Sequence, residues 1–180
     1  MPTFVALLRG VNVGKAKRVP MQALRTLLGG LGYADVTTLL NSGNAVFRAS
    51  GSSTAAHARA IELAIVQTLG VEVAVVVKSA RQLAAIVAEN PFARGAADHS
   101  RLLVAFTPDK AGLTALVGIE PLVEPPEAFA VGRHAAYLHC AAGILESKAG
   151  AALLGKLGKA ATTRNWATTL KLQALVAACA

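Results

Sequence analysis

The chain has 180 residues, enough for one compact domain or for two small halves. Its hydrophobic content of 54% is raised by alanine, and polar residues interrupt every apolar run well before the roughly 18 to 20 residues that a membrane span requires. These features predict a soluble protein without a membrane partner. The amino-terminal apolar run has the pattern of a strand and lacks a basic leader, so we expect a cytoplasmic protein.

The positive charge of the chain is concentrated in two stretches. The net charge is +8, and the stretches 9–25 and 147–180 hold ten Lys or Arg residues and no Asp or Glu. Both stretches also contain small polar residues, which suit the binding of an anion better than the filling of a core. The sequence therefore predicts a local anion site, and it does not name the ligand.

Cysteine and histidine residues give no sign of a metal centre. The two cysteines are far apart, which predicts neither a disulfide framework nor zinc spacing, and the four histidines share no short metal-binding spacing. We expect no structural metal and no cofactor.

The first half of the chain alternates between strand and helix periodicities. Short apolar runs predict strands, whereas apolar residues at helical spacing, as at Leu24, Leu27 and Leu28, predict helices. The composition of 41–44 is typical of a tight hairpin turn, and Gly70 is expected to end a helix. The expected elements are a strand at 3–8, a helix at 21–31, strands at 36–40 and 45–48, a helix from about 54 to 69 and a strand at 71–77. This β-α-β-β-α-β order is the split βαβ, or ferredoxin-like, motif.

The second half repeats most of this order. A linking helix at 79–89 is stopped by Asn90-Pro91, and a polar connector at 93–100 follows. The next expected elements are a strand at 101–106, a helix at 110–117, hairpin strands at 128–131 and 135–140, and a helix at 150–157. A final helix at 165–178 has no counterpart in the first half. The fold class is thus α/β (α+β), with two tandem split-βαβ subdomains and an extra C-terminal helix.

These patterns divide the chain into two expected domains. The first, 1–92, is a split-βαβ subdomain with the linking helix, and the second, 93–180, is a related subdomain with the C-terminal helix. The two can also pack as one compact unit.

Four motifs of the chain are distinctive in combination: Leu8-Arg9-Gly10-Val11-Asn12-Val13-Gly14, Val19-Pro20-Met21 with Leu24, Asn41-Ser42-Gly43-Asn44-Ala45-Val46-Phe47, and Thr162-Thr163-Arg164-Asn165-Trp166-Ala167-Thr168 with Lys171. Together they resemble the bacterial domain-of-unknown-function 1697 family. The resemblance spans nearly the full chain and implies two related α/β subdomains, but no settled activity. The family pattern often has Gly-Gly-Lys after the first loop, where this chain has Gly14-Lys15-Ala16-Lys17.

The first motif lies in a loop between a strand and a helix, where backbone amides and the helix start can face an anion. The candidate ligand-binding residues here are Arg9, Gly10, Asn12, Gly14 and Lys15. An equally weighted alternative is a purely structural loop, in which the glycines adopt positive φ and Asn12 caps the backbone.

The turn at 41–44 has the same two interpretations. Ser42 and Asn44 would add hydroxyl and amide groups to the anion site if the turn and the first loop open on the same edge of the sheet. Alternatively they serve only the turn, because Asn and Gly tolerate left-handed conformations.

The segment 162–166 is the most specific one. Thr163 or Asn165 can cap the last helix, and the guanidinium of Arg164 can bind phosphate or carboxylate through two parallel hydrogen bonds. Trp166 is either a core residue or a platform for a base, and the former is the more common role. The candidates in this region are Lys148, Thr163, Arg164, Asn165, Thr168 and Lys171.

The leading functional hypothesis is a binding protein for a small phosphate-bearing, nucleotide-like ligand, in a basic polar cleft shared by Arg9 and Arg164. Two alternatives remain open: an enzyme acting on such a ligand, whose catalytic residues are not evident, and an RNA-binding or protein-interaction module. Nucleic acid ranks lower as a partner because only 4% of the residues are aromatic and no RNA-recognition motif is present.

Overall fold

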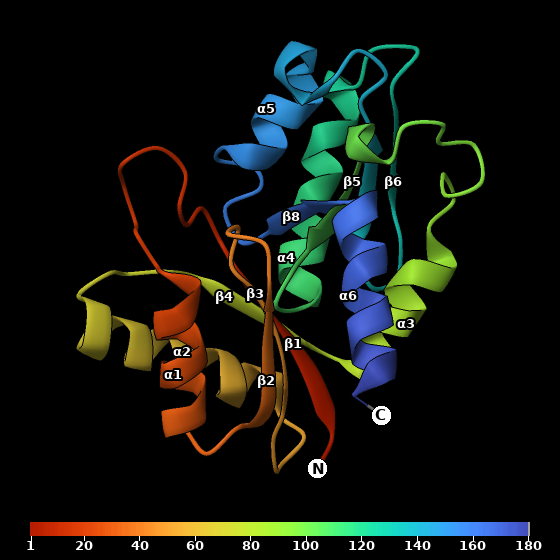
Figure 1. Ribbon diagram of the computed structural model, residues 1–180. Coiled ribbons are helices and arrows are strands. Elements are labelled where there is room, and N and C mark those ends of the chain that lie inside the picture. Colours follow the sequence, from red (N-terminus) through yellow and green to blue (C-terminus); the bar gives the residue numbers. More distant parts are fainter. Residues whose placement is uncertain (180) are drawn as a thin grey trace. The chain divides into compact units, whose positions relative to one another are not determined.

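The computed structural model describes residues 1–179 (Figure 1). Its helices and strands are β1 (Thr3–Leu8), α1 (Met21–Gly30), β2 (Ala34–Leu39), β3 (Asn44–Arg48), α2 (Thr54–Leu69), β4 (Val75–Ser79), α3 (Ala80–Glu89), η1 (His99–Arg101), β5 (Leu102–Phe106), α4 (Lys110–Ala115), η2 (Leu116–Leu122), β6 (Ala128–Val131), β7 (Ala136–His139), η3 (Ile144–Glu146), α5 (Lys148–Leu154), β8 (Thr162–Asn165) and α6 (Trp166–Ala178), where η denotes a 3-10 helix.

The chain forms two compact units. Met1–Leu83 and the chain from Leu172 onward make the first unit, and Ala84–Lys171 make the second. These units divide within α3 and within α6. The expected boundary between the two subdomains, at 92/93, stays a prediction.

The first unit contains a four-stranded antiparallel sheet in the order β2-β3-β1-β4. Alternate residues of β1, such as Phe4, Ala6 and Leu8, belong to a core that also holds buried residues of α1 and α2, including Leu24 and Ile61. This alternation is what a strand with one face on helices requires. The strand order and the antiparallel pairing confirm the ferredoxin-like topology expected for the first half.

The second unit has the same topology. Its sheet is antiparallel in the order β6-β7-β5-β8, which corresponds strand by strand to the first sheet. Its core includes Leu103 of β5, Leu138 of β7 and Leu153 of α5. The predicted internal repeat is therefore confirmed, with a helix preceding the first hairpin strand and another following the hairpin in each unit.

The structure corrects the prediction for the end of the chain. Thr162–Asn165 forms β8, a strand that the sequence analysis did not predict, and it pairs with β5. The helix after it, α6, follows β8 as α3 follows β4, so the final helix does have a counterpart in the first half. The strand is not recognisable from the sequence, because it has only four residues, all polar, and so shows no alternation of apolar and polar positions.

Smaller differences concern element ends. The strand expected at 71–77 lies at β4, Val75–Ser79, because pairing with β1 and not the density of valine sets its position. The helix expected at 150–157 is α5, which begins at Lys148 behind the capping hydroxyl of Ser147. In the described part of the chain, no helix is both long and apolar enough to cross a bilayer.

The β6–β7 hairpin of the second unit holds the carboxylate of Glu89, at the end of α3. Backbone N–H groups of residues 133–135 donate to its two oxygens at 2.9 to 3.2 Å. The hydroxyl of Tyr137 has one proton to donate and lies between two acceptors, the same carboxylate at 3.0 Å and the carbonyl oxygen of Ile86 at 2.6 Å. These bonds fix the end of α3 to the hairpin.

A buried histidine joins the aromatic core of the first unit. The ring of His57 lies against Phe4 and Phe47, and its Nδ1 is 2.8 Å from the hydroxyl of Tyr33. Burial lowers the pKa of His57 below its ordinary value of 6.5. The folded state therefore favours the neutral ring, whereas the unfolded chain binds a proton more readily.

This difference predicts an acid-sensitive fold. Stability from neutral His57 is fully present above its ordinary pKa of 6.5 and is lost as the pH falls through the lowered pKa of the folded state. In chemical denaturation between pH 5 and 7.5, the free energy of unfolding should fall less with decreasing pH for His57→Gln than for wild type. The exposed His134 provides the control, since His134→Gln should keep the wild-type profile. An identical pH profile for wild type and His57→Gln would contradict the assignment.

Candidate functional site

The β1–α1 loop, residues 9–20, is organised by the side chain of Asn12. Its Nδ2 donates to the carbonyl oxygens of Val19 at 2.8 Å and Asn41 at 2.7 Å, and its Oδ1 accepts from the backbone N–H of Val19 at 2.9 Å. The backbone N–H of Asn12 also donates to the carbonyl oxygen of Lys17 at 3.1 Å. Asn12 thus closes the loop on itself and fastens it to the β2–β3 turn, which confirms the capping contacts expected if the loop is structural and leaves ligand binding a prediction.

The same contacts place the loop and the turn on one edge of the first sheet. Asn12 reaches Asn41, and the backbone N–H of Leu8 donates to the carbonyl oxygen of Gly43 at 2.8 Å. The condition under which Ser42 could join the loop in one site is therefore met. Ser42 is exposed, and its hydroxyl accepts from Asn44 at 2.8 Å.

The side chain of Asn44 is buried and makes hydrogen bonds within the β2–β3 turn. Its side chain is 0% exposed, and Nδ2 also donates to the carbonyl oxygen of Leu39 at 2.8 Å. Such a side chain stabilises the hairpin directly. Its contact with a ligand stays a prediction.

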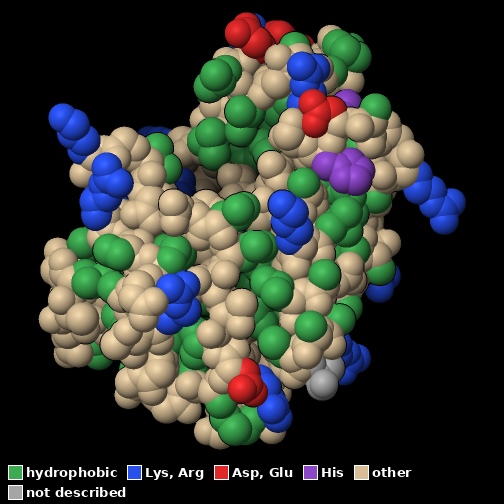
Figure 2. Space-filling view, in the orientation of Figure 1, with side chains coloured by type: hydrophobic (Ala, Val, Ile, Leu, Met, Phe, Trp, Pro, Cys, Tyr) green, Lys and Arg blue, Asp and Glu red, His purple; other side chains and the backbone are tan. Residues whose placement is uncertain are grey.

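Most of the other loop residues are exposed, and four of them are basic. Gly10, Asn12, Gly14 and Lys17 have positive φ, between 49° and 64°. Lys15, Lys17 and Arg18 are exposed and Arg9 is half-buried. Figure 2 shows Lys and Arg side chains standing out from the surface where Figure 1 places this loop, at the upper left.

The second predicted segment, in β8 and α6, is more buried than its polar composition suggests. Arg164 is only 8% exposed and donates through one guanidinium nitrogen to the hydroxyl of Thr162 at 2.9 Å and the carbonyl oxygen of Thr163 at 2.8 Å. Burial lowers the pKa of Arg164 to about 10, so the side chain still carries its charge at neutral pH. Trp166 is 4% exposed, which confirms the core interpretation for that residue.

The remaining candidates of this segment have mixed environments. Asn165 caps α6, since its Oδ1 accepts from the backbone N–H of Thr168 at 2.9 Å. Thr168 is buried and Lys171 is exposed. Lys148 is exposed and pairs with Glu124 at 2.7 Å, and this hydrogen bond raises the pKa of the Lys148 ammonium group. Arg9 belongs to the first unit and Arg164 to the second, and their sharing of one cleft stays a prediction.

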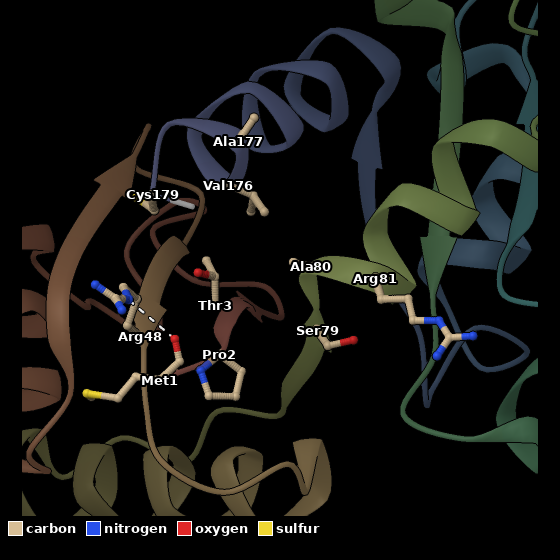
Figure 3. A pocket seen from close by; sticks show the side chains of 10 residues that line it. All are labelled: Met1, Pro2, Thr3, Arg48, Ser79, Ala80, Arg81, Val176, Ala177 and Cys179. Carbon is tan, nitrogen blue, oxygen red and sulfur yellow. Dashed lines mark hydrogen bonds between the residues drawn. The ribbon is translucent and has the colours of Figure 1, made fainter.

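Two hollows of the first unit were not predicted from the sequence. One, of about 440 Å³, is lined by the start of β1, Arg48, the start of α3 and the end of α6 (Figure 3). Figure 3 shows Nε of Arg48 directed at the carbonyl oxygen of Met1, at 3.3 Å, and Arg81 extending away from the other labelled side chains. The second hollow, of about 650 Å³, lies between α2 and residues 72–74, and Lys17 of the loop lines it.

Metal binding has no evident site in the described structure. Among residues 1–179, no three His, Cys, Asp or Glu side chains are grouped so that they could hold an ion. The chemistry available at the loop is that of cations, backbone amides and hydroxyls, which bind anions.

Truncation of the Asn12 side chain should measurably lower the stability of the fold. Asn12→Ala removes three hydrogen bonds and places Ala at a φ of 57°, so unfolding free energy should fall by about 2 kcal/mol or more. Asn12→Gly removes the same bonds without the strain, so it should recover about 1 kcal/mol relative to Ala in urea denaturation. Wild-type stability in both variants would show that these bonds do not hold the loop.

Gly43 tests how tightly the turn packs on the loop. A Cβ added there would lie 2.6 Å from Cβ of Leu8 and 2.7 Å from Cγ2 of Val11, so Gly43→Ala must displace the turn. Gly51 is a matched control, because its φ of 84° is nearly equal to the 85° of Gly43 and nothing lies within 4 Å of an added Cβ. We expect Gly43→Ala to lower the midpoint of thermal unfolding clearly more than Gly51→Ala. Equal losses would mean that only backbone strain matters.

Comparison with known proteins agrees with this description. No curated protein matches the chain in sequence. A solved structure described as the conserved bacterial protein SP0830 from Streptococcus pneumoniae is similar in fold, with a TM-score of 0.81 and 22% sequence identity over 97% of this chain and 98% of that one. The family described as "Protein of unknown function (DUF1697)" matches residues 1–137, which include the Asn12 loop and the 41–44 turn. The chain belongs to this DUF1697 family.

Proposed function

We propose that the β1–α1 loop binds the phosphate group of a small, nucleotide-like anionic ligand. The observation that carries this proposal is the contrast between the two units at the same position of the repeat. In the second unit the connection from β5 to α4 is short, 107–109, and the carboxylate of Asp109 accepts from the backbone N–H of Gly112 at 2.8 Å. An internal anion thus satisfies the start of α4.

The first unit has the opposite arrangement. Its connection from β1 to α1 is long, 9–20, and α1 begins behind Pro20, which has no side chain able to cap the helix. No acidic residue precedes Asp35 in the sequence. The start of α1 therefore has no capping carboxylate from its own loop or first turn, and an external anion is a complementary partner.

The backbone and the charge of the loop support the same ligand. Left-handed residues within a loop are part of the conformations that gather backbone N–H groups into anion-binding nests. Lys15, Lys17 and Arg18 of the same loop are exposed and add positive charge to it. The contacts of Asn12 give the loop a defined shape before a ligand arrives, which lowers the entropic cost of binding.

The contribution of the second basic segment is a further part of this proposal. Arg164, Asn165 and Lys171 would contact the same ligand. An enzyme acting on the ligand and a module that binds an acidic macromolecule stay alternatives to simple binding.

Calorimetric titration with inorganic pyrophosphate tests the loop. Wild-type protein should bind at low salt and more weakly as salt increases. The double variant Lys15→Ala/Arg18→Ala should bind at least about tenfold more weakly, since each hydrogen bond to a charged group contributes about 1.5 to 3 kcal/mol. The control is Lys110→Ala/Arg133→Ala, which removes two exposed cations of the second unit outside both basic stretches and should bind as wild type. Equal binding by both double variants, or none by wild type, would reject the loop as the site.

A further inference from the structure

A groove of about 650 Å³ continues from the loop along the first unit. It lies between the outer side of α2 and residues 72–74, which lead into β4. The lining residues that matter for its chemistry are Lys17, Arg59, Glu62, Leu63, Val66 and Glu72. Its volume is in the range of small-molecule sites in proteins.

Hydrogen bonds of the backbone hold this groove and the loop together. Lys17 lines the groove with its side chain, while its carbonyl oxygen accepts from the backbone N–H of Asn12 at 3.1 Å. Ala74, on the opposite wall, accepts from the backbone N–H of Arg9 at 2.9 Å. A ligand whose phosphate lies on the loop can therefore extend into the groove past Lys17.

Besides the charged Arg59 and Glu62, the wall formed by α2 carries two apolar side chains that are open to solvent. Leu63 is 58% exposed and Val66 is 40% exposed, although both are large hydrophobic side chains. They lie off the buried face of α2, which carries Ile61 and Ile65. An apolar ring placed against these two side chains would remove part of their surface from water, which favours binding.

Two carboxylates stand at the same groove. Glu72 is exposed, and Oε1 of Glu62 accepts from the backbone N–H of Val75 at 2.9 Å, which fixes the position of that side chain. Carboxylates accept hydrogen bonds from hydroxyl and amino groups and repel phosphate. They therefore favour a ligand that places its phosphate toward Lys17 and its uncharged donors between the two glutamates.

We infer that this groove binds the nucleoside part of a nucleoside phosphate, with the base against Leu63 and Val66 and the sugar hydroxyls or an amino group on Glu62 and Glu72. The inference rests on the proposed function, because the loop would hold the phosphate. A phosphosugar fits less well, since it has donors for the carboxylates but no apolar ring for the wall.

A comparison of the affinities of several small ligands tests the groove separately from the loop. Inorganic pyrophosphate, ribose 5-phosphate and each of ADP, GDP, CDP and UDP would be titrated into the full chain. The tightest nucleoside diphosphate should bind at least about tenfold more strongly than pyrophosphate, equivalent to about 1.4 kcal/mol. Ribose 5-phosphate should not bind tenfold more strongly than pyrophosphate.

Two groove variants should lower only the nucleotide affinity. Leu63→Ser and Glu72→Gln should each weaken nucleoside diphosphate binding about three- to tenfold without weakening pyrophosphate binding. Leu154→Ser is the control for the first, because Leu154 is a leucine of similar exposure, 53%, in the second unit. Glu120→Gln, at an exposed glutamate of the second unit, is the control for the second.

The outcomes separate the two proposals. Pyrophosphate binding that depends on the loop, with no gain for any nucleoside diphosphate, overturns the groove and leaves the loop function in place. Nucleotide binding that depends on Leu63 and Glu72 but not on Lys15 and Arg18 supports the groove and rejects the loop. Equal affinity for ribose 5-phosphate and the best nucleotide rejects the apolar wall, and binding of no probe overturns both proposals.

Discussion

The amide side chain of Asn12 is the contact on which the arrangement of the candidate site depends. One side chain joins three parts of the chain, since it donates to Val19 and Asn41 and accepts from Val19. Both partners of Nδ2 are carbonyl oxygens, and Oδ1 accepts from a backbone N–H, so the site needs a donor pair and an acceptor in one short group. Asn is the residue that supplies these at this length, and it also tolerates the left-handed backbone at φ 57°.

This contact also links the fold to the surface. Val19 directly precedes Pro20 and α1, so the position of the first helix is set by the same side chain that shapes the loop. Gly43 allows the hairpin turn to press against Leu8 and Val11 at a distance that a side chain would prevent. The exposed basic residues of the loop are thereby carried on a well-packed edge of the sheet, which holds their backbone in place.

Much of the fold follows from local patterns, whereas the site depends on contacts between distant residues. α2 is predicted well because Ile61 and Ile65 recur at helical spacing and Gly70, at φ 67°, ends the helix. β8 is missed because Thr162–Asn165 is short and polar, although β-branched Thr and the need for a fourth strand in the repeat give a usable signal.

The site is predictable in its residue types and not in its geometry. The capping role of Asn12 follows from its place in a Gly-rich loop, but its bond to Asn41 spans 29 positions and no local pattern shows it. The burial of Arg164 is equally hidden, because a cationic residue beside small polar ones suggests a surface. The groove could have been suspected from helical periodicity, since Leu63 and Val66 are apolar residues that lie off the buried face of α2.

The hairpin of the second unit holds the carboxylate of Glu89 through backbone N–H groups of residues 133–135. Because these bonds come from the main chain, substitution of the side chains of Arg133 or His134 leaves them in place. Such anchoring lets the side chains of this hairpin turn vary in sequence while the attachment of α3 to the second sheet is kept.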